Sequence, residues 1–301
     1  MKKWYIYQKE RFYTFRYMLL IALLVVGGIF YSDALFNLTT GAVNYGLAFV
    51  STFIWFVLIR IFHEHKDFDE NMRVRPYLPV QRGVVSLKEL KFAAAFLMMV
   101  QLAISVYIHW MVGAVAIGGY LWLAFMTKDY GIPVLLKRYP IAYVLSQLTI
   151  VLFVALHITA FSWGGNRTPN PSLVYFVLFT YFNGAAIIVG RKMKAPAEER
   201  EGLFTYSNEL GLENASYLLM SVAFGATTAF LFAGMTMGMD FYSIGAMVGA
   251  TLAFFVGCTL LIRSGWKKLE RPFKWLTGVW IVVSYGILLG SILWAQLFAS
   301  I

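Results

Sequence analysis

The densest group of chemically active side chains in the sequence directly follows a long apolar run. Residues 60–71 read Arg-Ile-Phe-His-Glu-His-Lys-Asp-Phe-Asp-Glu-Asn. If the apolar helix continues into this stretch, side chains three and four positions apart share one face. Mg²⁺ needs only one or two protein carboxylates beside water and phosphate oxygens, so such a face could hold it. The face would carry Arg60, His63, Glu64, Asp67 and Asn71.

A second polar stretch lies further along the chain and has a similar make-up. We call residues 60–83 the first polar segment and residues 190–207 the second polar segment. The second combines the acids Glu198 and Glu199 with three cations nearby, namely Arg191, Lys192 and Lys194. Acids for a metal and cations for phosphate oxygens favour a lipid-linked diphosphate as substrate. The predicted metal ligands are Glu64, Asp67, Asn71, Glu198 and Glu199; the alternative is that these acids merely balance the neighbouring bases.

The composition indicates the surroundings in which these segments must work. Hydrophobic residues make up 60% of the 301 residues and charged residues only 13%, which is too apolar for a soluble globular domain. Runs long enough to cross a bilayer as helices predict an all-α integral membrane protein. Nine such spans are expected, at about 14–31, 42–62, 90–110, 112–127, 140–163, 172–190, 215–236, 241–262 and 275–299.

The distribution of basic residues predicts how these spans are oriented. With the N-terminus in the cytoplasm and the C-terminus outside, every one of the 25 Lys and Arg residues except Arg167 falls in a cytoplasmic segment. The net charge of +10 therefore reflects membrane topology, and we expect no nucleic-acid partner. Both polar segments would face the cytoplasm, and the expected location is a bacterial inner membrane.

The two polar segments follow the second and the sixth predicted spans. This placement indicates one transmembrane domain, residues 1–301, built from pseudo-repeat halves at about 14–138 and 140–274 with a last helix at 275–299. Sequence identity between the halves is weak.

This arrangement resembles the UbiA superfamily of intramembrane prenyltransferases, whose members have nine transmembrane helices and Asp-rich loops after the second and sixth. The resemblance covers nearly the whole chain. Its most specific parts are Arg75-Pro-Tyr-Leu-Pro-Val-Gln-Arg-Gly83 with Ser86-Leu-Lys-Glu-Leu90, and Gly202-Leu-Phe-Thr-Tyr-Ser207 with Gly211.

The chain departs from the family pattern in both polar segments. The first family motif is an Asn-Asp pair with further Asp residues four and eight positions after the Asn. Here His63 takes the Asn position, Glu64 that of the adjacent acid, and Asn71 that of the last Asp, so that Asp67 alone is unchanged. Around the second motif, Lys194 and Glu198 stand in place of a regular acidic cluster.

The resemblance implies a Mg²⁺-dependent enzyme in the bilayer that ionises an isoprenoid diphosphate and transfers the prenyl group to an aromatic or other lipophilic acceptor. The catalytic residues implied are Asp67, Glu64, His63 and Asn71. The residues expected to bind the diphosphate are Arg60, Lys66, Arg75, Arg191, Lys192, Lys194, Asn183 and Tyr206.

Two other functions remain open. The altered first motif favours a UbiA-type terpene cyclase, which would close farnesyl or geranylgeranyl diphosphate on itself. A non-catalytic transporter or binding protein on the same fold is a third reading, although the spans hold few of the charged residues that ion-coupled carriers place near mid-membrane. A zinc site at His63 and His65 lacks the HExxH spacing.

We expect several polar residues within the spans to have structural roles. We expect Gln101 and Gln147 to bond between helices. His109 and His157 are expected to be interfacial or hydrogen-bonded structural residues.

Overall fold

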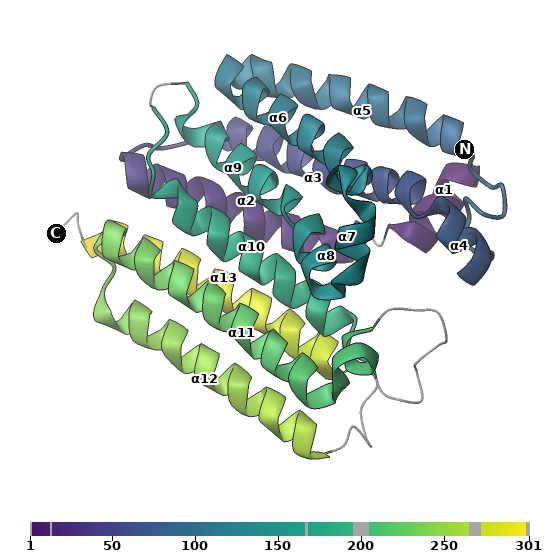
Figure 1. Cartoon of the computed structure of the whole chain (residues 1–301). Coiled ribbons are helices and arrows are strands. Elements are labelled where there is room, and N and C mark those ends of the chain that lie inside the picture. The colour runs from purple at the N-terminus through teal and green to yellow at the C-terminus, as the bar shows by residue number, and fades with distance from the viewer. Residues whose placement is uncertain (1, 13, 166–167, 195–204, 265–271, 299–301) are drawn as a thin grey trace. The chain divides into compact units, whose positions relative to one another are not determined.

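The computed structural model describes residues 2–12, 14–165, 168–194, 205–264 and 272–298. Within these ranges all regular elements are helices and none is a strand (Figure 1). The first part of the chain forms α1 (Lys2–Arg11), α2 (Thr14–Phe36), α3 (Ala42–Lys66), α4 (Phe68–Val74), α5 (Leu87–Ile108), α6 (Trp110–Thr127), the 3-10 helix η1 (Asp129–Gly131), α7 (Pro133–Arg138), α8 (Pro140–Gln147) and α9 (Ile150–Trp163). The second part forms α10 (Leu173–Arg191), α11 (Tyr206–Met237), α12 (Phe241–Ser264) and α13 (Pro272–Phe298).

The described residues contain 9 helical spans that are long and apolar enough to cross a membrane. The predicted fold class, an all-α membrane protein with nine spans, is therefore confirmed. The spans are Tyr17–Phe36, Ala42–Lys66, Leu87–Ile108, Trp110–Thr127, Ile141–Trp163, Leu173–Arg191, Tyr206–Met237, Phe241–Ser264 and Pro272–Ala295. The orientation of the termini stays a prediction.

Two spans differ from the predicted continuous helices. The fifth is divided into α8 and α9 by a turn at residues 148–149. The seventh begins at Tyr206, before the predicted 215, and bends at Gly211, whose φ is +76°. A positive φ is open to glycine at no steric cost, so a short helical piece precedes the bend. Apolar periodicity alone does not predict that polar first turn.

The helices gather into two compact units, Met1–Pro169 and Asn170–Ile301. The single-domain prediction and the boundaries of the pseudo-repeat halves stay predictions. In the first unit, α9 packs against α2, α3 and α6, and α5 packs against α3 and α6.

The core of the first unit is built around the indole ring of Trp55 on α3. This side chain is fully buried, and its ring centroid lies 5.1 Å from that of Tyr120 and 5.9 Å from that of His157. Gly119 on α6 makes room for it, because a Cβ there would lie 2.5 Å from the Trp55 ring. The close approach of α3 and α6 thus depends on a missing side chain.

In the second unit, α10 packs against α11 and α13, and α12 packs against the same two helices. Phe179 on α10 lies between neighbours on both sides, 6.4 Å from the Phe230 ring and 5.0 Å from the Tyr285 ring. Tyr285 also donates from its hydroxyl to Thr180 Oγ1 over 3.1 Å. Apolar packing and buried hydrogen bonds together hold α10 against α13.

Candidate active site

Helix α3 carries the start of the first polar segment, residues 60–66, and ends at Lys66. Asp67 follows in a non-helical conformation (φ −95°, ψ 13°) and also begins α4. The hydrogen-bond ladder nevertheless continues, because Asp67 N donates to His63 O and Asn71 N donates to Asp67 O, both over 2.9 Å. His63, Asp67 and Asn71 therefore remain successive one-turn neighbours across the joint.

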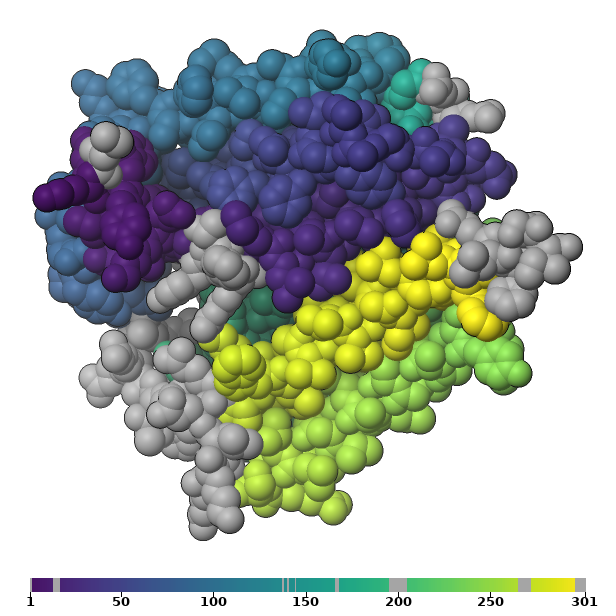
Figure 2. All heavy atoms as spheres, turned by 180° about the vertical axis from the view of Figure 1, so that it is seen from behind, coloured from purple at the N-terminus to yellow at the C-terminus, as the bar shows by residue number. Residues whose placement is uncertain are grey.

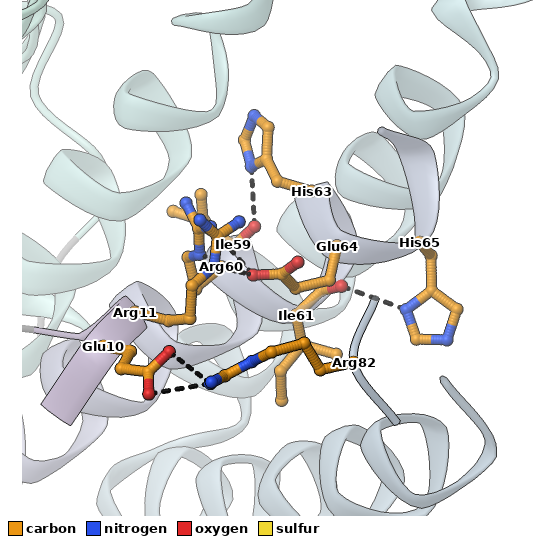
Figure 3. A network of polar contacts seen from close by, with 9 residues as sticks. All are labelled: Glu10, Arg11, Ile59, Arg60, Ile61, His63, Glu64, His65 and Arg82. Carbon is orange, nitrogen blue, oxygen red and sulfur yellow. Dashed lines mark hydrogen bonds and ion pairs between the residues drawn. The ribbon is translucent and has the colours of Figure 1, made fainter. Parts of the chain in front are cut away.

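Glu64 is completely buried and is the centre of a charge cluster (Figure 3). Its Oε1 accepts from Arg11 Nε over 2.6 Å, and from Arg60 Nε and Nη2 over 3.1 and 2.8 Å. Its Oε2 is buried and has no hydrogen-bond partner among the described residues. Two guanidinium groups thus share one carboxylate, and the cluster keeps one excess positive charge.

The two histidines of the first polar segment turn away from the Glu64 carboxylate, as Figure 3 shows. His63 Nδ1 lies 2.7 Å from Ile59 O, and His65 Nδ1 lies 3.0 Å from Ile61 O. A carbonyl oxygen only accepts, so Nδ1 of His63 carries a hydrogen. Across the part of the chain that the structure describes, no group of three or more His, Cys, Asp or Glu side chains is placed to hold a metal.

Lys66 has partners on η1 and α8, later in the first unit. It forms an ion pair with Asp129 of η1, and its Nζ donates to Gln147 Oε1 over 2.8 Å. The Nζ also lies 4.8 Å from the centroid of the Tyr143 ring. The predicted diphosphate ligand is thus enclosed by a carboxylate, an amide and an aromatic ring of its own chain.

The remaining residues of the first polar segment lie on or just after α4. Asp67 is half-buried and Asn71 is buried, whereas Asp69 and Glu70 are exposed. Arg75 follows directly after α4 as its C-cap, where its N–H donates to Asn71 O over 2.8 Å, and its side chain is half-buried. Asp67, Asn71 and Arg75 therefore follow one another at four-residue intervals.

The second polar segment is described only at its two ends, and Glu198 and Glu199 lie outside the described residues. The two ends are joined by main-chain donors. Tyr206 N donates to Lys192 O over 3.1 Å, and Lys194 N donates to Ser207 Oγ over 2.9 Å. The last turn of α10, including the exposed Arg191, is therefore held beside the first turn of α11.

Asn183 on α10 is buried and bonded to α13. Its Oδ1 accepts from Trp280 Nε1 over 2.9 Å and from Ser284 Oγ over 3.5 Å. Its Nδ2 is buried without a hydrogen-bond partner among the described residues. The amide joins two helices, and its predicted contact with diphosphate stays a prediction.

The other polar residues within the spans have structural partners. Gln101 donates to Ser51 O over 2.8 Å and accepts from Tyr120 over 2.8 Å, and Gln147 accepts from Lys66, so both amides bond between helices as expected. His157 is buried between Trp55 and Ser105, with 3.0 Å to each. His109 caps α6 by accepting from Met111 N over 3.3 Å.

Three solved structures resemble this chain over nearly its whole length. One, described as a digeranylgeranylglyceryl phosphate synthase in membranes, has a TM-score of 0.61 at 14% identity over 97% of this chain and 99% of its own. A UbiA homologue from Aeropyrum pernix K1 has a TM-score of 0.63 at 13% identity over 92% and 98%. A UbiA homologue from Archaeoglobus fulgidus bound to Cd²⁺ has a TM-score of 0.56 at 14% identity over 94% and 99%.

The chain has the UbiA fold. The predicted resemblance to the UbiA superfamily is confirmed at the level of the fold, which is what 13–14% identity supports. No family model and no curated protein matches the sequence.

Two residues of the UbiA-type first unit were missed by the sequence analysis. Arg11 lies outside the polar segments, but it follows Lys3 and Tyr7 at four-residue spacing, a pattern that could have pointed to one charged face of a short helix. Asp129 is an isolated acid in a short connection, and its pairing with Lys66 depends on the packing of α3 beside α6. No local pattern signals that contact.

The donor set of this UbiA-type chain fits Mg²⁺ in part. Asp67 and Asn71 offer a carboxylate and an amide oxygen one turn apart, which are the hard oxygen donors that Mg²⁺ prefers. Glu64 does not share that setting, because two guanidinium groups already neutralise it. The ion would take the rest of its shell from water and from phosphate oxygens.

Proposed function

We propose that the chain is a UbiA-type intramembrane prenyltransferase, which cleaves the carbon–oxygen bond of an isoprenoid diphosphate and transfers the prenyl group to a lipophilic acceptor. The observation that carries this proposal is the likeness to UbiA homologues over 92–97% of this chain and 98–99% of theirs. One of these neighbours is described as a synthase that acts in membranes.

The first polar segment supplies the groups for the first step. In the proposal, Asp67 and Asn71 hold Mg²⁺, and the bound ion neutralises charge on the departing diphosphate. Arg75, one turn beyond Asn71, binds phosphate oxygens. In the second polar segment, the cations Arg191, Lys192 and Lys194 have the same proposed role, and we assign it also to Asn183 on α10 and Tyr206 on α11.

Two of the residues predicted to bind diphosphate, Arg60 and Lys66, have acidic partners that favour a structural role instead. Arg60 is held by Glu64 and Lys66 by Asp129. A cation that is already bonded to a carboxylate of its own chain attracts a diphosphate less strongly than it would without that carboxylate. Arg60 and Lys66 therefore act in the proposal chiefly by fixing the end of α3, to which Asp67 is attached.

The test uses purified protein in nanodiscs with Mg²⁺ and geranyl, farnesyl or geranylgeranyl diphosphate. The extract is analysed by mass spectrometry with and without an aromatic or an isoprenyl glyceryl phosphate acceptor; the latter follows from the description of one neighbour. A prenylated acceptor supports the proposal. Absence of product and of released diphosphate with every donor and acceptor would overturn it.

Asp67 and Asp69 make a matched pair for assigning the metal-binding acid. Asp69 is exposed on α4, two residues from the half-buried Asp67. Asp67→Asn should lower the rate of diphosphate release at least about 100-fold, because a bound cation supplies several kcal/mol of charge stabilisation. Asp69→Asn should leave the rate within about threefold. Equal effects of the two substitutions would remove Asp67 from its proposed role.

Terpene cyclisation is the second candidate, and the altered first motif favours it. Asn71 stands where the family motif has an Asp, and Glu64 forms ion pairs with Arg11 and Arg60. Fewer acids are therefore left to bind metal than in the family pattern. A cyclase would release a cyclic hydrocarbon or alcohol from farnesyl or geranylgeranyl diphosphate without any acceptor. A transferase would release product only when the acceptor is present.

A further inference from the structure

One face of helix α1 forms ion pairs with residues in and just after the first polar segment. Lys3 pairs with Glu89 at the start of α5, and Glu10 accepts from Arg82 Nη2 over 2.7 and 2.8 Å. Arg11 reaches Glu64. The α1 residues in these pairs lie at positions 3, 10 and 11, which together with position 7 form one side of a helix.

The position between these pairs is occupied by a buried ring. Tyr7 is only 7% exposed, and burial, with the nearby Glu64 carboxylate, raises the pKa of its hydroxyl. Directly after α1, Phe12 is buried and stacks on Tyr17 at 4.7 Å, and its ring lies 5.4 Å from that of Phe53 on α3. Figure 2 shows α1 in dark purple on the surface of the first unit, beside the blue residues of this region.

The three ion pairs of α1 differ in how much they are expected to stabilise its position. The side chains of the Lys3–Glu89 pair are 45% and 36% exposed, and those of the Arg82–Glu10 pair 43% and 39%. Exposed pairs of this kind contribute about 0–1 kcal/mol. In the Arg11–Glu64 pair the exposures are 11% and 0%, and removing one partner of a buried pair leaves an uncompensated charge. Arg11 is therefore the contact that decides where α1 lies.

The Arg11–Glu64 pair also makes Glu64 a poor ligand for a metal ion. Glu64 Oε1 already accepts three N–H groups from two cations, and a divalent ion on this carboxylate would bring further positive charge beside both guanidinium groups. The first acid of the motif is therefore already engaged by arginines. The next acid, Asp67, lies in the joint between α3 and α4, one turn from Asn71.

We propose that Arg11 is a positioning residue that straps α1 onto the first polar segment through Glu64, and that Glu64 serves this strap while the metal-binding part of the segment begins at Asp67. The strap follows from the geometry alone. The statement about metal rests on the proposed function, so the two are tested by separate measurements.

The strap is tested by limited trypsin digestion of the full chain in nanodiscs, with cleavage after Lys9 followed by mass spectrometry. Arg11→Met and Glu64→Gln should each speed this cleavage at least about tenfold, because either change breaks the buried pair. The double variant should be no faster than the faster single variant, since both changes remove the same interaction. Arg82→Met, which breaks an exposed pair, is the matched control and should stay within about twofold. Cleavage unchanged in Arg11→Met would overturn the strap.

The metal assignment is tested on the substrate-free protein by Mn²⁺ titration followed by electron paramagnetic resonance. Asp67→Asn should weaken Mn²⁺ binding at least about tenfold, whereas Glu64→Gln and Arg11→Met should stay within about threefold. If Glu64→Gln abolished Mn²⁺ binding while leaving cleavage after Lys9 unchanged, Glu64 would be a metal ligand and the proposal would be overturned. A wild-type protein that bound no Mn²⁺ would count against the proposed function and against the Asp67 assignment, and the cleavage rates would still decide the strap.

Discussion

Lys66 and Asp129 form an ion pair that joins the last residue of α3 to the first residue of η1. Both side chains are nearly buried, with 7% and 12% exposure. Asp129 lies in the left-handed region, with φ 49°, as does the next residue, Tyr130, with φ 57°. Two such residues in succession are costly, and they persist only where the surroundings hold them. The pair is one of the contacts that hold the connection after α6 in this conformation.

Lys66→Met is expected to destabilise the first unit, because it leaves the Asp129 carboxylate buried without its cation. Removing one partner of a buried pair typically costs about 3–5 kcal/mol. The measurement is the midpoint of unfolding in mixed detergent and dodecyl sulfate micelles. Adding Asp129→Asn should restore much of the loss, since Asn is uncharged and tolerates the left-handed region. A Lys66→Met protein of normal stability that had lost only its affinity for diphosphate would instead support direct substrate binding by Lys66.

A buried hydrogen-bond chain in the first unit determines the tautomer of His157. Ser105 Oγ donates its single hydrogen to Gln101 O over 2.7 Å, so at 3.0 Å from His157 Nε2 it must accept. Trp55 Nε1 donates to His157 Nδ1. The ring is therefore neutral with its hydrogen on Nε2, and ¹⁵N spectra of labelled histidine should show that form. Spectra with the hydrogen on Nδ1 would contradict the chain.

Trp55→Phe should cost stability through the same chain. It leaves His157 Nδ1 buried without a donor, which typically costs about 1–3 kcal/mol in addition to the lost ring contacts. Trp110→Phe is the matched control, because Trp110 is 63% exposed and should change the unfolding midpoint little. Equal midpoints for the two variants would show that the bond to His157 contributes nothing.

Gly190, the last position of α10 before Arg191, allows α10 and α13 to touch. A Cβ at residue 190 would lie 2.2 Å from Thr277 Oγ1 and 3.2 Å from Phe273 O. Gly190→Ala should therefore destabilise the second unit by about 1–3 kcal/mol, and Thr277→Ala should relieve part of that loss. Gly286→Ala on α13 is the control, since a Cβ there meets nothing within 4 Å. Thermal unfolding in detergent compares the three, and a neutral Gly190→Ala would contradict the close packing.

The spans could be predicted from the sequence because each requires only a long local run of apolar residues. The bend at Gly211 and the division of the fifth span could not, since both depend on a few backbone angles that hydropathy does not record. The short helix α1 was missed for a different reason. Its mean composition is polar, and it is held by Glu64, Arg82 and Glu89, which come much later in the chain.

The candidate site shows the same limit at the level of single side chains. The sequence of the first polar segment predicted that His63, Asp67 and Asn71 lie one helical turn apart. The hydrogen bonds from Asp67 N to His63 O and from Asn71 N to Asp67 O have that spacing. The sequence did not predict that Glu64 and Lys66 have charged partners from α1 and η1. Those partners depend on tertiary packing, which decides whether a carboxylate meets a metal or an arginine.

Asp240, just before α12, should make the stability of the second unit depend on pH in the acidic range. Its Oδ2 accepts from Ser243 Oγ over 2.6 Å and its Oδ1 from Ser243 N over 2.9 Å, and these bonds lower the pKa of the carboxyl group. Because the pKa is lower in the folded state, the stabilisation is present above the unfolded value of about 4 and is lost as the pH falls through the folded value. Asp240→Asn keeps an acceptor at every pH but loses the charge at the helix N-terminus, which is worth about 0.3–1 kcal/mol at an exposed site. Unfolding midpoints of the two proteins should differ at pH 7, and the difference should shrink as the pH falls below about 4. A difference that persisted unchanged at pH 3 would rule out the Asp240 carboxylate as its source.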